Sequence, residues 1–191
     1  TAPVQAFSPA TNNTPQYDIR FSHALKVLFF GVRNSTNTCE WSNYTTASPV
    51  FDGVATDFYP ASAVDPVLDA SLIYENTARL SNMGADYFSL VAPWYHAPAI
   101  PEETGYHMYS YSLDFYCLDP MGSTNYGKLT NVSMGVTGSS LAVTNNSARG
   151  THFPPAEEDG RYYNGQDYRF VMTAVNNNIV RISGGALGFP V

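Results

Sequence analysis

Residues 24–32 constrain the fold of this chain more than any other part of its sequence. Leucine, valine and phenylalanine fall on both alternate sets of positions there, so a strand would carry apolar side chains on both of its faces. One face of an antiparallel sheet normally meets water, and a strand that is apolar on both faces therefore needs a cover over its second face. We expect a long loop or another domain to supply that cover.

Regular alternation of apolar and polar residues predicts further strands along the chain. They are expected at residues 17–22, 67–74, 106–115, 130–137, 168–175 and 178–183, with a tight turn at Asn176 and Asn177. Residues 83–95 carry apolar side chains at helical spacing, but Pro93 and Pro98 limit a helix there to a turn or two. Many strands, long loops and little helical pattern predict an all-β fold, an antiparallel sandwich or barrel.

The domain organisation predicted from the sequence is simple. Residues 1–16 contain three prolines among serine, threonine and asparagine, a composition typical of an extended linker. Residues 17–191 show no internal repeat and are expected to form one domain. Two polar stretches, 34–66 and 138–165, are expected to be long exposed loops. Because the first residue is threonine and not methionine, we expect a fragment or a processed product.

Charge narrows the range of partners. Nine Lys and Arg residues stand against sixteen Asp and Glu residues, which gives a net charge of -7. A negative net charge disfavours binding to the phosphate backbone of nucleic acids or to anionic lipid, so we expect no direct nucleic-acid binding. No run of residues approaches the roughly 18 apolar residues needed to span a bilayer, so we expect no membrane insertion.

Residues that could carry chemistry are scattered. The histidines are His23, His96, His107 and His152. No two of them have the close spacing that brings two imidazoles to one metal ion, and we expect His107 to pack among aromatic rings. Residues 122–128 nearly match a phosphate-binding loop, but Leu129 stands where that loop requires a hydroxyl. We therefore predict no enzymatic activity, no cofactor and no metal, and we expect Cys39 and Cys117 to be free thiols.

Loop residues offer the remaining candidate sites. Aromatic pairs at Trp94 and Tyr95 and at Tyr162 and Tyr163 can cover the ends of a sandwich, anchor an interface or stack on sugar rings. The N-glycosylation motif matches at five positions, Asn12, Asn34, Asn43, Asn131 and Asn145, and the candidate glycan sites among them are Asn34, Asn43 and Asn145.

Several long segments resemble the iridovirus major capsid protein family. They include 18–24, 42–45, 71–77, 119–127 with 129–131, and 184–190. The resemblance covers nearly the whole chain and implies a double jelly-roll protein, of which this sequence matches only the C-terminal half. It implies an antiparallel eight-stranded jelly-roll sandwich with long loops and at most one or two short helices. Residues 17–191 would be the second barrel and residues 1–16 the interdomain linker.

The same resemblance implies a structural function. Family members form homotrimeric, pseudo-hexagonal capsomers that build an icosahedral virion shell, in contact with neighbouring capsomers and minor capsid proteins and assembled in the host cytoplasm. A missing partner barrel or a neighbouring subunit would then cover the second face of residues 24–32. The candidate interface residues are Leu25, Val27, Phe29, Trp94 and Tyr95. The alternative function is a carbohydrate-binding or adhesive β-sandwich that uses the loop aromatics.

Overall fold

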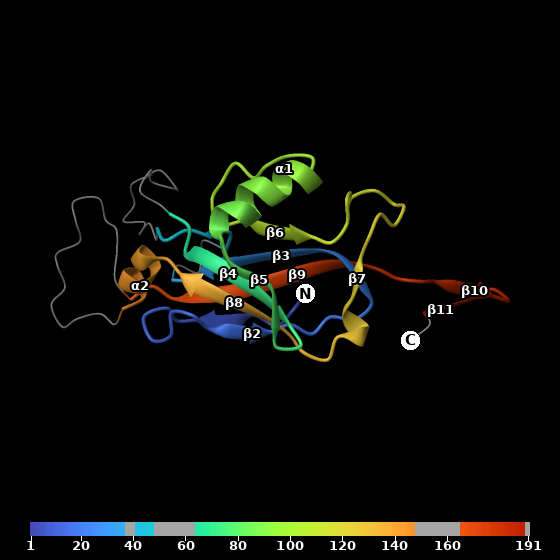
Figure 1. Cartoon of the computed structure of the whole chain (residues 1–191), viewed down its shortest axis with the longest axis horizontal. Helices are drawn as coiled ribbons and strands as arrows, with labels where there is room; N and C mark the ends of the chain where they lie inside the picture. Colours follow the sequence, from blue (N-terminus) through green and yellow to red (C-terminus); the bar gives the residue numbers. More distant parts are fainter. Residues whose placement is uncertain (37–40, 48–63, 148–164, 190–191) are drawn as a thin grey trace.

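The computed structural model describes residues 1–36, 41–47, 64–147 and 165–189, and it is built mainly of antiparallel strands (Figure 1). The strands are β1 (Gln5–Phe7), β2 (Gln16–Asp18), β3 (Ala24–Asn34), β4 (Val67–Tyr74), β5 (Thr77–Gly84), β6 (His107–Ser110), β7 (Thr124–Asn125), β8 (Val132–Gly138), β9 (Tyr168–Asn177), β10 (Arg181–Ser183) and β11 (Ala186–Gly188). The helical segments are η1 (Tyr87–Val91), α1 (Ala92–His96), η2 (Tyr126–Lys128) and α2 (Ser140–Asn146).

The strands form two main sheets whose order defines the topology. One sheet has the order β1-β9-β3-β6, with β7 pairing to β3 beyond the end of β6, and the other has the order β2-β8-β4-β5. The chain passes repeatedly from one sheet to the other, and every strand pairing in both sheets is antiparallel. Four strand positions in each of two sheets make a jelly-roll sandwich. The predicted antiparallel eight-stranded jelly roll is thereby confirmed.

The core lies between the two sheets. In β8 the buried residues Val132, Met134 and Val136 alternate with more exposed ones, as expected of a strand with one face inside. Tyr17 of β2 stacks on Phe170 of β9, with ring centroids 4.3 Å apart, and so joins the two sheets. Each large apolar side chain buried in this way contributes about 1.5–3 kcal/mol.

Part of the predicted linker belongs to the sandwich. Within residues 1–16, β1 pairs with β9, and the Ala2 amide donates a hydrogen bond to the Met172 carbonyl at 2.9 Å. Phe7 is completely buried in the main core. The expectation that residues 1–16 lie outside the core is therefore wrong for β1. Three residues between prolines are too few for an alternating pattern to reveal a strand.

The second face of β3 is covered by this chain itself. Val27 packs in a small cluster with Ala92 of α1 and Met108 of β6. Figure 1 shows the helical segment lying along β6 at the edge of the sheet. The expectation that a partner barrel or a neighbouring subunit covers this part of β3 is wrong, because the connection between β5 and β6 supplies the cover.

A β-bulge at Lys26 changes which side chains share a face. Leu25 lies opposite Asn176 and Val27 lies opposite Val175, so Lys26 has no partner of its own in β9. Leu25 therefore points into the main core, whereas Val27 points to the other face. An unbroken strand would have placed both side chains on one face.

The helical segment is longer than the sequence predicted. Residues 85–96 are helical without a break, with the wider π turn η1 followed by α1, which makes about three turns. Pro93, which has no N–H to donate, stands inside this continuous helix, directly after the wider π turn η1. Ala85, Phe88 and Ala92 face inward, so the opposite side of the helix faces out.

Candidate assembly surfaces

The outward side of the helical segment keeps two sequence-predicted interface residues accessible. Trp94 is 72% exposed and Tyr95 is 73% exposed, and Leu90 and Val91 on the preceding turn are also exposed. Large aromatic side chains left in water are typical of surfaces that bind another molecule. The structure therefore leaves these two candidates available for contact.

The other three candidates are less accessible than Trp94 and Tyr95. Leu25 and Val27 are completely buried within the described part of the chain. Phe29 is half-buried and makes an edge-to-face contact with Phe115, with ring centroids 5.7 Å apart. The prediction that Leu25 and Val27 form an interface is wrong, because the bulge turns one inward and the helix covers the other.

An apolar pocket of about 220 Å³ lies where the helical cover of β3 ends. Its floor is the outer face of the sheet at Phe29, Gly31 and Thr173, and its walls include Pro93 and Ala99. The absence of a side chain at Gly31 lets the backbone at Gly105 approach the sheet closely. A Cβ atom at residue 31 would lie only 2.8 Å from the Gly105 carbonyl oxygen. The cover of β3 is thus complete at Val27 and open at Phe29.

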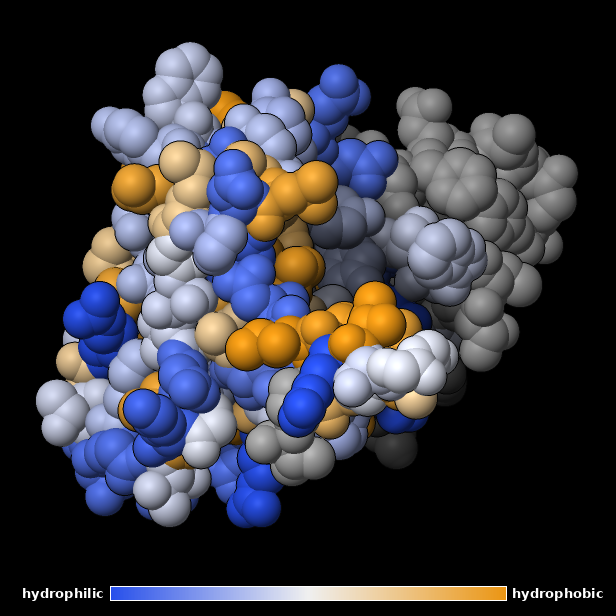
Figure 2. Space-filling model, turned by 90° about the vertical axis from the view of Figure 1, so that its right-hand side faces the viewer, coloured by the Kyte–Doolittle hydropathy of each residue, from blue (hydrophilic) through white to orange (hydrophobic). Residues whose placement is uncertain are grey.

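The C-terminal hairpin of β10 and β11 forms a second exposed apolar surface. In Figure 1 it extends away from the body of the sandwich, and Figure 2 looks onto that end, where apolar side chains coloured orange gather beside hydrophilic ones. Ile182 and Leu187 lie directly opposite each other across the two strands and are 74% and 62% exposed. The turn between β10 and β11 uses Gly184 and Gly185, both with positive φ. The tight turn predicted at Asn176 and Asn177 is wrong, because β9 runs through both residues.

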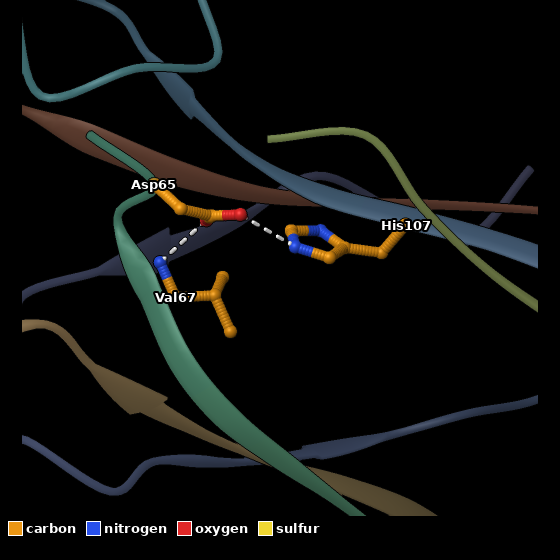
Figure 3. Close-up of polar contacts among 3 residues, drawn as sticks. All are labelled: Asp65, Val67 and His107. Atoms are coloured by element: carbon orange, nitrogen blue, oxygen red, sulfur yellow. Dashed lines mark hydrogen bonds and ion pairs between the residues drawn. The ribbon is translucent and has the colours of Figure 1, made fainter. Parts of the chain in front are cut away.

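A buried histidine connects the two sheets (Figure 3). His107 Nε2 lies 2.8 Å from Asp65 Oδ2, and Asp65 Oδ1 accepts a hydrogen bond from the Val67 amide at 2.8 Å. The imidazole also stacks on Phe30 with ring centroids 5.1 Å apart, which agrees with the expected aromatic surroundings. This pair fixes the start of β4 against β6. Sequence spacing gave no sign of it, because the partners are 42 positions apart.

Three tyrosines form a second polar link inside the molecule. Tyr111 Oη lies 2.5 Å from Tyr74 Oη and 2.7 Å from Tyr126 Oη. Burial raises the pKa of all three hydroxyls above its ordinary value, because the charged phenolate would lose its hydration. The cluster is neutral at physiological pH and is suited to holding the sheets together.

The candidate glycan sites are structural residues. Asn34, Asn43 and Asn145 are each at most 2% exposed. Their amide nitrogens donate to carbonyl oxygens at Thr45, Ala47 and Thr46, respectively. An attached glycan needs a free amide nitrogen with open space beside it, and so burial of all three side chains contradicts the predicted glycan attachment in the folded chain. These residues instead satisfy polar backbone groups in a buried loop.

The remaining candidate residues are the two cysteines and the second pair of aromatic residues. The structure describes Cys117, a free thiol that is partly buried, whereas Cys39, Tyr162 and Tyr163 lie outside the described residues. Among the residues that the structure covers, no group of three His, Cys, Asp or Glu side chains is placed to hold a metal ion. No helix in the described ranges is long and apolar enough to cross a membrane.

The fold first defines a class of proteins, the antiparallel jelly-roll sandwiches. The quasi-atomic model of the PBCV-1 virus capsid superposes with a TM-score of 0.69 at 18% identity, covering 99% of this chain and 49% of that one. The Faustovirus major capsid protein superposes with a TM-score of 0.57 at 11% identity, covering 91% of this chain and 32% of that one. At such low identity these matches establish the fold alone.

Sequence similarity then gives the family. The family model for the large eukaryotic DNA virus major capsid protein matches residues 1–188, and the chain belongs to that family. It is 59% identical over its full length to the major capsid protein of Invertebrate iridescent virus 3 and 50% identical to that of Lymphocystis disease virus 1. It covers 40% of the length of each of these two relatives. The resemblance to iridovirus capsid proteins is confirmed.

Proposed function

We propose that this chain is part of a structural major capsid protein whose copies assemble into the shell of a virion. The observation that carries the proposal is the family match over residues 1–188 on a jelly-roll sandwich. Exposed apolar side chains on two separate elements support it, because surfaces of this kind are left in water mainly where another molecule binds. The proposal assigns the chain no enzymatic activity and no cofactor.

The proposed assembly is a homotrimer with a pseudo-hexagonal outline, repeated in an icosahedral shell and built in the host cytoplasm. Its neighbours are other capsomers and minor capsid proteins, with no direct contact to nucleic acid and no insertion into a membrane. Because this chain covers 40% of its first relatives, the trimer belongs to the longer protein. Residues 17–191 are proposed as its second barrel, entered through residues 1–16, of which β1 joins the sandwich.

We place a contact between copies at the outward side of the helical segment. Trp94 and Tyr95 provide large rigid side chains with little entropy to lose on binding. Charged residues make up only 13% of the chain, and interface cores disfavour Lys, Glu and Asp. The net charge of -7 limits non-specific association before specific contacts form.

Light scattering at increasing concentration tests this contact. The double variant Trp94→Ser with Tyr95→Ser should weaken self-association of the chain by on the order of tenfold or more. The matched control is Trp41→Ser, since Trp41 is 77% exposed and lies far along the sequence. Equal weakening by control and double variant would contradict a specific contact at the helix.

A carbohydrate-binding function is the second candidate, favoured by the exposure of two adjacent aromatic side chains. Successive residues on a helix point about 100° apart, so Trp94 and Tyr95 do not make one flat platform. A glycan-array screen with Trp94→Ala and Tyr95→Ala controls separates the two functions. Sugar binding that both substitutions abolish, in a chain that stays monomeric, would favour this alternative over assembly.

A further inference from the structure

The C-terminal hairpin and the pocket beside β3 are two apolar features that the fold itself leaves unused. On the hairpin, Ile182 and Leu187 share one face, and the alternation of side chains along each strand extends that face toward Val180 and Phe189. These four side chains are between 48% and 74% exposed. An isolated two-stranded hairpin is marginally stable in water, so an apolar face of this kind is stabilised by packing on something else.

The pocket is a suitable receptor for one of these side chains. Its lining is mainly apolar, and the side chains in it that carry polar groups are Tyr44, Tyr106, His107 and Thr173. Its volume of about 220 Å³ exceeds that of an engineered cavity of roughly 150 Å³ that binds benzene. A leucine, isoleucine or phenylalanine side chain therefore fits inside.

The hairpin of a chain does not reach the pocket of the same chain. Thr173, in the pocket floor, lies midway along β9, and β9 then runs on to Asn177 before the hairpin begins. At about 3.3 Å per residue the chain has moved more than 10 Å along the sheet by that point. Figure 1 shows that the hairpin continues in the same direction, away from the body.

We infer that the β10–β11 hairpin of one copy docks its apolar face into the β3 pocket of a second copy. Charge disfavours hairpin against hairpin, because Arg181 is the only charged residue among residues 178–191 and two hairpins would bring like charges together, whereas the pocket lining includes no Lys or Arg. A contact between two different patches is heterologous, and repetition of such a contact produces rings or open chains of subunits. The inference rests on the proposed function and specifies one of its contacts.

Two variants test the two sides of this contact separately. Ile182→Ser with Leu187→Ser removes the apolar face of the hairpin, and Ala99→Trp, at an exposed position in the pocket wall, blocks the pocket without disturbing the core. In light scattering the unmodified chain should grow in mass with concentration beyond a dimer. Each variant alone should associate on the order of tenfold more weakly.

A mixture of the two variants provides the decisive measurement. The Ala99→Trp chain keeps its hairpin and the serine variant keeps its pocket, so an equimolar mixture should recover one hairpin–pocket contact and associate more strongly than either variant alone. Leu118→Ser, at a side chain that is 97% exposed, is the matched control and should associate like the unmodified chain. Circular dichroism and thermal melting confirm that each variant is folded.

Each result decides between defined alternatives. A mixture that stays monomeric overturns the inference, because hairpin and pocket then do not bind each other. Self-association that neither variant weakens also overturns it, but leaves the proposed assembly function in place. An unmodified chain that remains monomeric at every concentration overturns both the inference and self-assembly by this chain.

Discussion

Strand β3 and the C-terminal hairpin are both rich in apolar residues, but the fold buries those of β3 and leaves those of the hairpin exposed. At Val27 the second face of β3 is completely buried beneath α1, whereas Ile182 in the hairpin remains 74% exposed. The difference lies in what the chain places nearby. The connection from β5 to β6 lies along β6 at the edge of the sheet and packs on Val27 of β3, whereas the hairpin runs away from the body. Apolar sequence therefore shows where a cover is needed, and topology decides whether the same chain provides it.

Removing the aromatic anchor of the helical cover should give the largest effect. Phe88 is 1% exposed and contacts Phe30 edge to face, with centroids 5.2 Å apart. Phe88→Ala should lower the free energy of unfolding by about 3–5 kcal/mol, because it leaves a cavity in the main core. Denaturant titration measures the loss. Tyr95→Ala, on the exposed side of the same helical segment, should change stability by less than about 0.5 kcal/mol. Equal losses would mean that burial of Phe88 in the main core does not hold the helical segment on the sandwich.

Breaking the histidine link should have the next largest effect on the covered region. Asp65→Ala leaves the buried imidazole of His107 and the Val67 amide without their shared acceptor. The expected cost is about 1–3 kcal/mol, measured by denaturant titration. Asp69→Ala on β4 is the control, and we expect it to change stability by less than about 0.5 kcal/mol. A variant as stable as the unmodified protein would show that the pair contributes nothing to joining the sheets.

The tyrosine cluster should make the covered region sensitive to alkali. Because the folded pKa of Tyr126 lies above the unfolded value of about 10, its contribution to stability is complete below pH 10 and is lost as the pH rises toward the folded pKa. Tyr126→Phe should therefore flatten the fall in stability above pH 10, although it also removes the hydrogen bond to Tyr111. Denaturant titrations at several alkaline pH values measure this slope. An unchanged slope would contradict the prediction.

Glu75 should give a small effect of opposite sign in acid. Its Oε1 accepts hydrogen bonds from the amides of Asn131 and Thr130, which lower the pKa of this carboxyl group. The stability it contributes is present above the unfolded pKa and is lost as the pH falls through the lowered folded value. Glu75→Gln should reduce the dependence of the melting temperature on pH in that acidic range. Identical acid melting profiles would show that these bonds do not stabilise the charged form.

The hairpin should give the smallest effect on stability. Leu187→Ser changes a side chain that is 62% exposed, so we expect the free energy of unfolding to shift by less than about 0.5 kcal/mol. The same substitution in β3, Leu28→Ser, is the contrasting control, because Leu28 is completely buried. A large loss of stability in Leu187→Ser would remove the distinction between the two apolar regions.

The strand expected at residues 106–115 shows how local hydrogen bonds can end a strand earlier than the alternation of apolar and polar residues predicts. Its alternation continues to Phe115, yet β6 ends at Ser110. Ser110 Oγ donates to the Ser112 carbonyl, and Asp114 Oδ1 accepts from the Cys117 amide at 3.1 Å. Short polar side chains offer the backbone such alternatives to a neighbouring strand, and a pattern of apolar positions does not register them.

Among the candidate site residues, the sequence identified the two that remain accessible but could not separate them from the others. Trp94 and Tyr95 were predicted as loop aromatics; they lie in α1 and not in a loop, and they are exposed. Leu25 and Val27 looked equally suitable. Their burial depends on the bulge at Lys26 and on a helical segment that begins about 60 positions further along the chain. The pocket and the apolar face of the hairpin appear only when distant strands are paired.

By itself the sequence determined that this chain is an antiparallel all-β fold, a sandwich or barrel, because alternation of side chains with period two is a property of each strand alone. Its family could likewise be recognised from long ordered segments. Only the tertiary structure decided which apolar surfaces are buried and which face water. That outcome depends on contacts between elements far apart in the chain, such as α1 on β3, and no local pattern encodes where a connection will cross a sheet.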